Sequence, residues 1–299
     1  MIVTVTLNPA LHVHYDADQV TPGAANRVGR VRNEAGGRGL AVARLLHTFG
    51  HDVVAAGLAG GSSGELIRIE LAKAGVATQF TRIGAESRRV VRILDRSSGQ
   101  VTSLEEPSPY ITTEELGRLA ADYRALLDGA TAVLLCGSLP AGLPPETYGS
   151  LTSYAAQAGV PVVLDAGGSA LRHGAARGPA LVIPELAAGD AQPRRDGPGS
   201  VVLAVPHGVR VLTAAGEWMA EVGPGHAGAS PGDSECASPA RLTDALVAGF
   251  VPGIALSWSW PDTLRHAVAL AASVSADGEA DLVKYEALLT HVAVTAPGS

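Results

Sequence analysis

Short apolar runs and amphipathic segments alternate along most of the chain. The apolar runs are typical of buried parallel strands, and they lie at residues 2–7, 53–58, 132–136 and 161–165. Segments with apolar residues at helical spacing follow them, at residues 40–46, 64–74, 113–127 and 148–158. Further along, the pattern predicts strands at 180–183 and 201–205, a hairpin of 209–213 with 218–222, and helices over 261–275 and 281–290. This alternation predicts an α/β fold in which helices flank a sheet.

Two β-rich stretches interrupt the alternation. Residues 12–35 contain short β-prone pieces among Gly, Pro and polar residues, and residues 77–109 contain several strand patterns. We expect both stretches to form a smaller sheet, a lid on a single domain of residues 1–299. Residues 187–200 and 223–239 are rich in Gly and Pro and predict loops.

Composition and charge exclude several classes of protein. The net charge is -7 and no run of Lys or Arg occurs, which argues against a nucleic-acid surface. Cys136 and Cys236 lie far apart, so the sequence predicts neither a CxxC zinc site nor a disulfide framework. No apolar run has transmembrane length, and the N-terminus has no basic region before its first apolar run. We therefore expect a cytoplasmic protein with no membrane partner.

One carboxylate, Asp244, lies within the apolar pattern of a predicted helix that continues through Phe250. Ser238 is a candidate N-cap and Pro239 suits the first helical position. A charge on such a helix needs a partner or a function, because burying it unpaired costs free energy. From spacing alone Asp244 is either a capped or solvent-facing residue or a functional one.

Glycines at residues 36, 37 and 39 open the helix at 40–46. A glycine-rich turn at a helix N-terminus presents free backbone N–H groups and suits an anion, although tight turns also need glycine. Ser138 follows the buried run 132–136, at the strand end where ligands bind in open α/β sheets.

Several short motifs together resemble the PfkB-type, ribokinase-like carbohydrate kinases, closest to the branch of 1-phosphofructokinases and tagatose-6-phosphate kinases. The motifs are Thr-Leu-Asn-Pro-Ala-Leu at 6–11, Pro-Gly and Asn-Arg at 22–27, Gly-Gly-Arg-Gly at 36–39, Glu-Ser-Arg at 86–88, Glu-Pro at 106–107, Gly-Ser-Leu-Pro at 137–140, Leu-Asp at 164–165 and Val-Ala-Gly-Phe at 247–250. The resemblance implies a three-layer α/β/α sandwich with a small β-sheet lid. Family members often pair through such lids, so the resemblance also implies a homodimer.

The resemblance assigns roles to particular residues. Asp244 matches the general base that takes a proton from the sugar hydroxyl. Substrate binding is expected of His12, Arg27, Gly37, Arg38, Gly39, Arg88, Arg92 and Ser138. The arginines suit the phosphate of a sugar phosphate, because a guanidinium binds phosphate with two parallel hydrogen bonds. His12 stands where the family has a hydroxyl-binding Asp, so a different polyol is expected.

The nucleotide side departs from the family pattern. Arg241-Leu242-Thr243 replaces the Gly-Ala-Gly turn whose N–H groups form an anion hole, and Arg241 and Thr243 are the candidate replacements for it. The motifs at 183–188 and 204–208 are also altered. We therefore expect weak or absent ATP binding, with Mg²⁺ as a candidate cofactor and no metal ligands assigned. A rival alignment places the catalytic acid at Asp233.

Three functions follow from these residues. The first is a phosphohydrolase acting on a sugar phosphate or cyclitol-like phosphate, with Asp244 as general acid or base. The second is an ATP-dependent sugar or sugar-phosphate kinase similar to 1-phosphofructokinase. The third is a non-catalytic sugar-phosphate binder that kept the kinase scaffold. Fold alone cannot choose among them.

Overall fold

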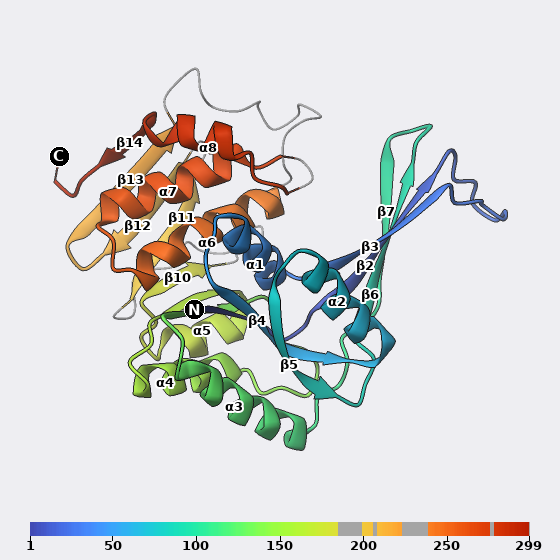
Figure 1. Ribbon diagram of the computed structural model, residues 1–299, viewed down its shortest axis with the longest axis horizontal. Coiled ribbons are helices and arrows are strands. Elements are labelled where there is room, and N and C mark those ends of the chain that lie inside the picture. Colours follow the sequence, from blue (N-terminus) through green and yellow to red (C-terminus); the bar gives the residue numbers. More distant parts are fainter. Residues whose placement is uncertain (185–198, 206–207, 223–238, 276–277, 299) are drawn as a thin grey trace.

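The computed structural model describes the chain except residues 185–198, 206–207, 223–238, 276–277 and 299 (Figure 1). The described residues contain a ten-stranded sheet with a parallel centre and an antiparallel edge. Its order is β14 (Val292–Thr295), β13 (Gly216–Val222), β12 (Gly208–Thr213), β11 (Ser200–Val205), β10 (Leu181–Pro184), β9 (Val162–Ala166), β8 (Ala132–Cys136), β1 (Ile2–Thr6), β4 (Val53–Gly60) and β5 (Ala77–Ile83). The central strands β1, β8 and β9 are wholly buried, as their apolar runs predict.

Helices cover both faces of this sheet and enclose two hydrophobic cores. One core lies under α1 (Arg38–Thr48), α2 (Gly61–Lys73), α6 (Pro239–Ala255), α7 (Trp260–Ser273) and α8 (Leu282–Leu289). The other lies under α3 (Thr113–Leu127), α4 (Thr147–Gln157) and α5 (Gly168–Ala175). Figure 1 shows α3 and α4 on the opposite side of the strands from α6 and α7. The three-layer α/β/α architecture is confirmed.

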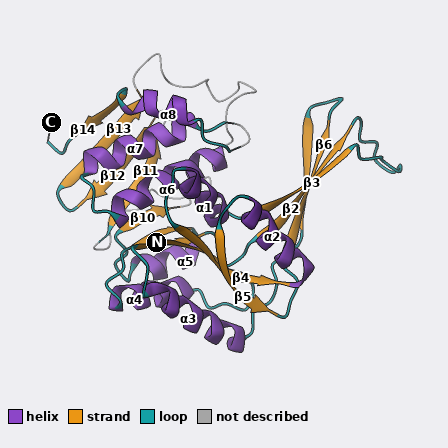
Figure 2. Ribbon diagram, in the orientation of Figure 1, coloured by secondary structure: helices purple, strands orange, loops and turns teal. Residues whose placement is uncertain are grey.

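A second, four-stranded sheet forms the lid, in the order β3 (Arg30–Gly36), β2 (Ala10–Ala17), β6 (Arg88–Asp95) and β7 (Gln100–Glu105). In Figure 2 its strands extend away from the helices and the large sheet. Strand β2 pairs antiparallel with β3 and parallel with β6, so the first β-rich stretch and the second lie side by side. The two-part lid is therefore the element that connects residues far apart in the sequence.

The lid is smaller than the sequence predicts. Residues 77–83, which we expected in it, form β5 and pair parallel with β4 at the edge of the large sheet. The reason is burial, since Thr81 and Ile83 point into the body while the lid strand β7 is exposed along its whole length. Helix α5 and strand β14 also form without having been predicted. The predicted loops at 187–200 and 223–239 lie largely outside the described residues.

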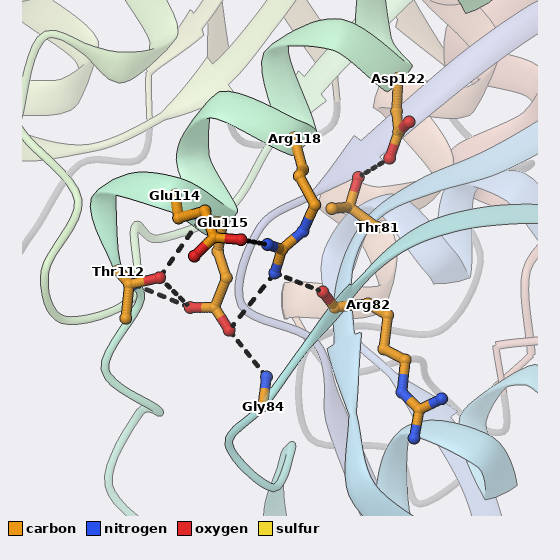
Figure 3. Close-up of polar contacts among 8 residues, drawn as sticks. All are labelled: Thr81, Arg82, Gly84, Thr112, Glu114, Glu115, Arg118 and Asp122. Atoms are coloured by element: carbon orange, nitrogen blue, oxygen red, sulfur yellow. Dashed lines mark hydrogen bonds and ion pairs between the residues drawn. The ribbon is translucent and has the colours of Figure 1, made fainter.

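Figure 3 shows how α3 is attached to the edge of the large sheet. Thr112 and Glu115 form a reciprocal capping box, as expected for Thr followed three residues later by Glu. Glu115 Oε1 also accepts a hydrogen bond from the Gly84 N–H at 2.7 Å, just after β5. Thr81 Oγ1 donates to Asp122 Oδ2 at 2.6 Å. Cap and side-chain bonds together fix α3 against β5.

Candidate functional site

A cavity of about 430 Å³ lies between the lid and the carboxyl ends of the central strands. Its walls come from β1, β8, α1 and α6 on one side and from all four lid strands on the other. The lining residues are Thr6, Asn8, His12, Glu34, Gly36, Gly37, Arg38, Ala41, Arg44, Arg88, Val90, Arg92, Glu105, Cys136, Gly137, Ser138, Ala240, Arg241 and Asp244. A strand-end cavity of this kind is the usual ligand position in open α/β sheets.

Arg38 connects two buried carboxylates at the cavity wall. Its guanidinium lies 3.0 Å from Asp165 Oδ1 and 3.4 Å from Asp244 Oδ1. Asp165 is fully buried at the end of β9, and its Oδ2 accepts a hydrogen bond from the Cys136 thiol at 2.9 Å. Burial and the neighbouring Asp165 raise the pKa of that thiol well above its usual range. One guanidinium thus compensates carboxylates from two elements far apart in the chain.

The carboxyl group of Asp244 has a pKa close to neutral pH. Burial is the main cause, and the Asp165 charge adds to it, while Arg38 and Arg241 oppose the shift. Together these effects raise the pKa of Asp244 to about 7. A carboxyl with such a pKa can accept or donate a proton at physiological pH, which is the requirement for a general base or a general acid.

Glu34 organises the lid side of the cavity. Its Oε1 lies 3.0 Å from the Arg44 guanidinium and 3.1 Å from that of Arg241, and its Oε2 lies 3.2 Å from His14 Nε2. Burial alone would raise the pKa of Glu34, but the His14 hydrogen bond and the two arginines outweigh it and hold the pKa well below its usual range. Glu34 is therefore a carboxylate that ties β3 to α1 and α6.

His12 lies beside this cluster as a neutral imidazole. Burial, and then the charge of Arg92, lower the pKa of His12 to about 4. Gly36 makes room for the ring, because a Cβ on Gly36 would lie 2.3 Å from His12 Nε2. The sequence did not predict this close approach, because Gly36 was explained there by the glycine-rich turn before α1.

Several buried polar atoms on the cavity wall have no hydrogen-bond partner among the described residues. They are Thr6 Oγ1, Asn8 Oδ1, His12 Nδ1 and Arg88 Nε. Buried polar atoms in folded proteins are normally satisfied, so a group of unsatisfied ones around one cavity indicates a polar ligand. Asn8 is held in place by donating to Ser108 Oγ at 2.9 Å and Ser138 Oγ at 3.1 Å, which leaves its carbonyl oxygen for a ligand.

Most residues proposed from the sequence meet at this cavity. His12, Gly37, Arg38, Arg88, Arg92, Ser138, Arg241 and Asp244 line it. Gly39 does not, and instead allows α1 to approach β1, because a Cβ there would lie 2.4 Å from Thr6 Oγ1. Arg27 lies on an exposed segment outside the cavity. Thr243 is half-buried outside the lining, and Asp233 lies outside the described residues.

Several contributors were not predicted as site residues, among them Thr6, Asn8, Glu34, Arg44 and Asp165. Thr6 and Asn8 belong to the first motif quoted above, so the polar positions at the end of the first strand were a usable signal. Asp165 likewise ends a buried apolar strand, where a charged residue needs a reason. Glu34 and Arg44 carry no such signal, because only the fold brings β3, α1 and α6 together.

The profile of the pfkB family carbohydrate kinases matches residues 10–189, more than half of the chain. The chain belongs to the pfkB family. Solved structures of the same fold include phosphofructokinase-2 from Escherichia coli, at TM-score 0.82 and 23% identity over 97% of this chain and 98% of that one. A Thermotoga maritima protein described as a "possible 1-phosphofructokinase" superposes with TM-score 0.80 at 22% identity over 99% of both chains. A carbohydrate kinase from Agrobacterium tumefaciens superposes with TM-score 0.72 at 18% identity, over 98% of this chain and 99% of that one.

Membership of the pfkB family bears on the three functions considered from the sequence. The family consists of carbohydrate kinases, and the similar structures include phosphofructokinases. The comparisons therefore favour the kinase alternative over the phosphohydrolase that we placed first. No helix within the described residues is long and apolar enough to span a membrane.

Proposed function

We propose that this pfkB-family protein catalyses phosphoryl transfer on a phosphorylated sugar or cyclitol-like polyol, with Asp244 moving the proton at the reacting hydroxyl oxygen. The observation that carries the proposal is the position of Asp244. It is a buried carboxyl with a pKa near 7, on the wall of the cavity that also contains the lid arginines Arg88 and Arg92. A proton-transfer group and an anion-binding group thus face one polar cavity.

The chemistry of the protein groups follows from their surroundings. As a carboxylate, Asp244 takes the proton from a hydroxyl as that oxygen attacks phosphorus; as a carboxylic acid, it returns the proton to the oxygen as it leaves. Arg38 lies within reach of Asp244 and stabilises its charged form. Arg88 and Arg92 bind the phosphate that the substrate already carries, which fixes the sugar at one end.

Transfer toward the hydroxyl is the first candidate for the direction of the reaction, since the family's members are carbohydrate kinases. An Escherichia coli phosphofructokinase-2 of the same fold was solved with fructose-6-phosphate, a phosphorylated sugar. A sugar phosphate of similar size is accordingly the proposed substrate class.

Arg241 and Thr243, the candidate replacements for the anion hole, do not lie together on the cavity wall. Arg241 points to Glu34 in the acceptor cavity, and Thr243 does not line that cavity. Helix α6 begins at Pro239, so the N–H of Thr243 lies beyond the first helical turn and bonds within the helix. These positions support the proposal that ATP binds weakly.

The same start of α6 favours hydrolysis as a second candidate. Because the N–H of Thr243 bonds within the helix, α6 offers a nucleotide phosphate fewer free donors just before Asp244 than a Gly-Ala-Gly turn would. Water would then accept the phosphoryl group, and Asp244 would act as the acid that protonates the leaving sugar oxygen.

Two measurements on the wild-type protein separate the alternatives. Calorimetry with ATP, with and without Mg²⁺, is followed by assays of a sugar-phosphate panel for nucleotide-dependent phosphorylation and for phosphate release without nucleotide. ATP-dependent product supports the kinase direction, and phosphate release without nucleotide supports the hydrolase. Sugar-phosphate binding with neither activity overturns the proposal in favour of the non-catalytic binder.

We also propose a homodimer formed through the lid and a cytoplasmic location. Val31, Val101 and Leu104 on the lid strands are exposed apolar residues, which a second copy could cover. A tetrameric form was solved for the Escherichia coli phosphofructokinase-2. Light scattering of the wild type and of a Leu104→Asp variant tests the dimer, which predicts that the variant is monomeric.

A further inference from the structure

His12, His14 and Glu34 form a cluster on the lid strands β2 and β3 that the proposed reaction does not require as a unit. Their candidate ligand atoms all lie within 4.8 Å of one another. His12 and His14 are two residues apart on β2, so both side chains point to the same face of the strand. Glu34 stands directly opposite His12 in the β2–β3 register, and Figure 1 shows these two strands side by side. Backbone pairing therefore preforms the arrangement.

We propose that His12, His14 and Glu34 form a three-ligand site for a divalent transition metal ion of the zinc type, open to the cavity on its remaining side. Two histidines and a carboxylate, with an open fourth position, are a common donor set for such an ion. The inference concerns metal binding and does not rest on the proposed reaction.

The distances suit this assignment. Bonds of about 2.0–2.1 Å from zinc to nitrogen and oxygen place tetrahedral ligand atoms about 3.3 Å apart. His14 Nε2 and Glu34 Oε2 are 3.2 Å apart, close to that separation. His12 Nδ1 is buried and has no hydrogen-bond partner among the described residues, so a rotation of its ring toward the other two ligands breaks no hydrogen bond of that atom.

The arginines around the cluster act in two opposite ways. Arg44 and Arg241 both bind Glu34 Oε1, which turns Oε2 toward His14 and orients the ligand as outer-shell groups do in metal sites. Their charges, and that of Arg92 beside His12, repel a cation and weaken its binding. The proposal therefore expects an affinity limited by neighbouring positive charge, and removal of such a charge should strengthen binding.

The test measures zinc binding to the full chain after removal of adventitious metal by chelator dialysis. Zn²⁺ is titrated against a chromophoric competitor, and Co²⁺ replaces it in a parallel experiment that reads its visible d–d absorption. The proposal expects one equivalent of Zn²⁺ per chain and a Co²⁺ spectrum with nitrogen ligands. His14→Ala and Glu34→Gln should each weaken zinc by at least about 100-fold, more than an outer-shell change.

Two further variants make the test specific. His47→Ala removes an exposed histidine on α1, outside the cluster, and should leave zinc binding unchanged. Arg92→Gln removes a charge next to His12 without touching a ligand and should tighten zinc severalfold. Circular dichroism of each variant confirms folding before the titration. No bound zinc in the wild type, or unchanged binding in His14→Ala and Glu34→Gln, overturns the proposal, and the second outcome places the metal elsewhere in the chain.

Discussion

The two walls of the cavity differ in what holds their charges. At the ends of the central strands, the buried carboxylates of Asp165 and Asp244 both lie beside the guanidinium of Arg38. Where the lid meets α1 and α6, the carboxylate of Glu34 on β3 lies between the guanidinium groups of Arg44 and Arg241, and Arg88 and Arg92 of β6 add further positive charge. Two carboxylates beside one guanidinium leave Asp244 with a pKa near 7, which suits proton transfer. Near the lid, the four arginines outnumber the carboxylates Glu34 and Glu105, which suits the phosphate of a substrate. Substitutions on each side of the cavity test whether proton transfer and phosphate binding are separated in this way.

The largest effect is expected at Asp244. Asp244→Asn keeps the shape and removes the proton-transfer function, so turnover should fall about 10²–10⁴-fold while sugar-phosphate binding survives. Steady-state assays and calorimetry on the same preparation measure both quantities. Asp233→Asn is the control for the rival alignment. Activity that is lost in Asp233→Asn and kept in Asp244→Asn would move the catalytic role to Asp233.

Arg38 is next, because its removal leaves two buried carboxylates without their shared partner. Arg38→Met should lower the free energy of unfolding by about 3–5 kcal/mol, the usual cost of breaking a buried ion pair on one side. Urea denaturation measures it. The matched control is Arg68→Met, which breaks an exposed ion pair with Glu65 at 3.2 Å and should cost about 0–1 kcal/mol. Equal losses in both variants would contradict the compensation we describe.

The lid wall is tested at Arg88, which lines the cavity and has an unsatisfied buried Nε. Arg88→Ala should weaken sugar-phosphate binding by about 1.5–3 kcal/mol, the range for a hydrogen bond to a charged group. Its neighbour Arg89 is exposed on the other face of β6 and pairs with Glu106, so Arg89→Ala is the matched control. Calorimetry that finds the two variants alike would remove Arg88 from the binding site.

The pH dependence of the free energy of unfolding reports the raised pKa of Asp244. The folded protein keeps this carboxyl protonated up to about pH 7, whereas an Asp in the unfolded chain loses its proton near its ordinary pKa of 3.8. Between these values the folded state binds the extra proton, so stability from this group falls as pH rises. The wild type should lose up to about 1.4 kcal/mol per pH unit relative to Asp244→Asn across that window. Urea denaturation of both proteins at about pH 4.5 and about pH 6.5 measures this. A difference in the free energy of unfolding between wild type and variant that is the same at both pH values would refute the prediction.

The dependence of turnover on pH also reports the protonation of Asp244. A kinase needs Asp244 as a carboxylate, so its turnover should rise as pH passes through about 7. A hydrolase that uses the protonated form should show the reverse, with turnover falling through the same pH. Whether turnover rises or falls with pH near pH 7 thus separates the two candidate reactions.

The sequence by itself determined the sheet, most of its helices and the identity of the proton-transfer candidate. The apolar runs of β1, β8 and β9 are long enough for strands and too short for helices, so their type was unambiguous. Asp244 was identifiable because a carboxylate among apolar helix positions needs a partner or a function, since burying it unpaired costs free energy. Family motifs then located Ser138, just after β8, and His12 on β2.

Only the tertiary structure decided which charges meet. Arg38 and Asp244 are separated by 206 residues, and Arg241 and Glu34 by 207, so no local pattern connects them. The assignment of residues 77–83 was wrong for the same reason: a β-strand pattern specifies extended backbone, but the partner strand depends on which face finds burial. Electrostatic partners and strand neighbours are set by packing between distant segments, and that packing fixed the pKa of Asp244 and the form of the cavity.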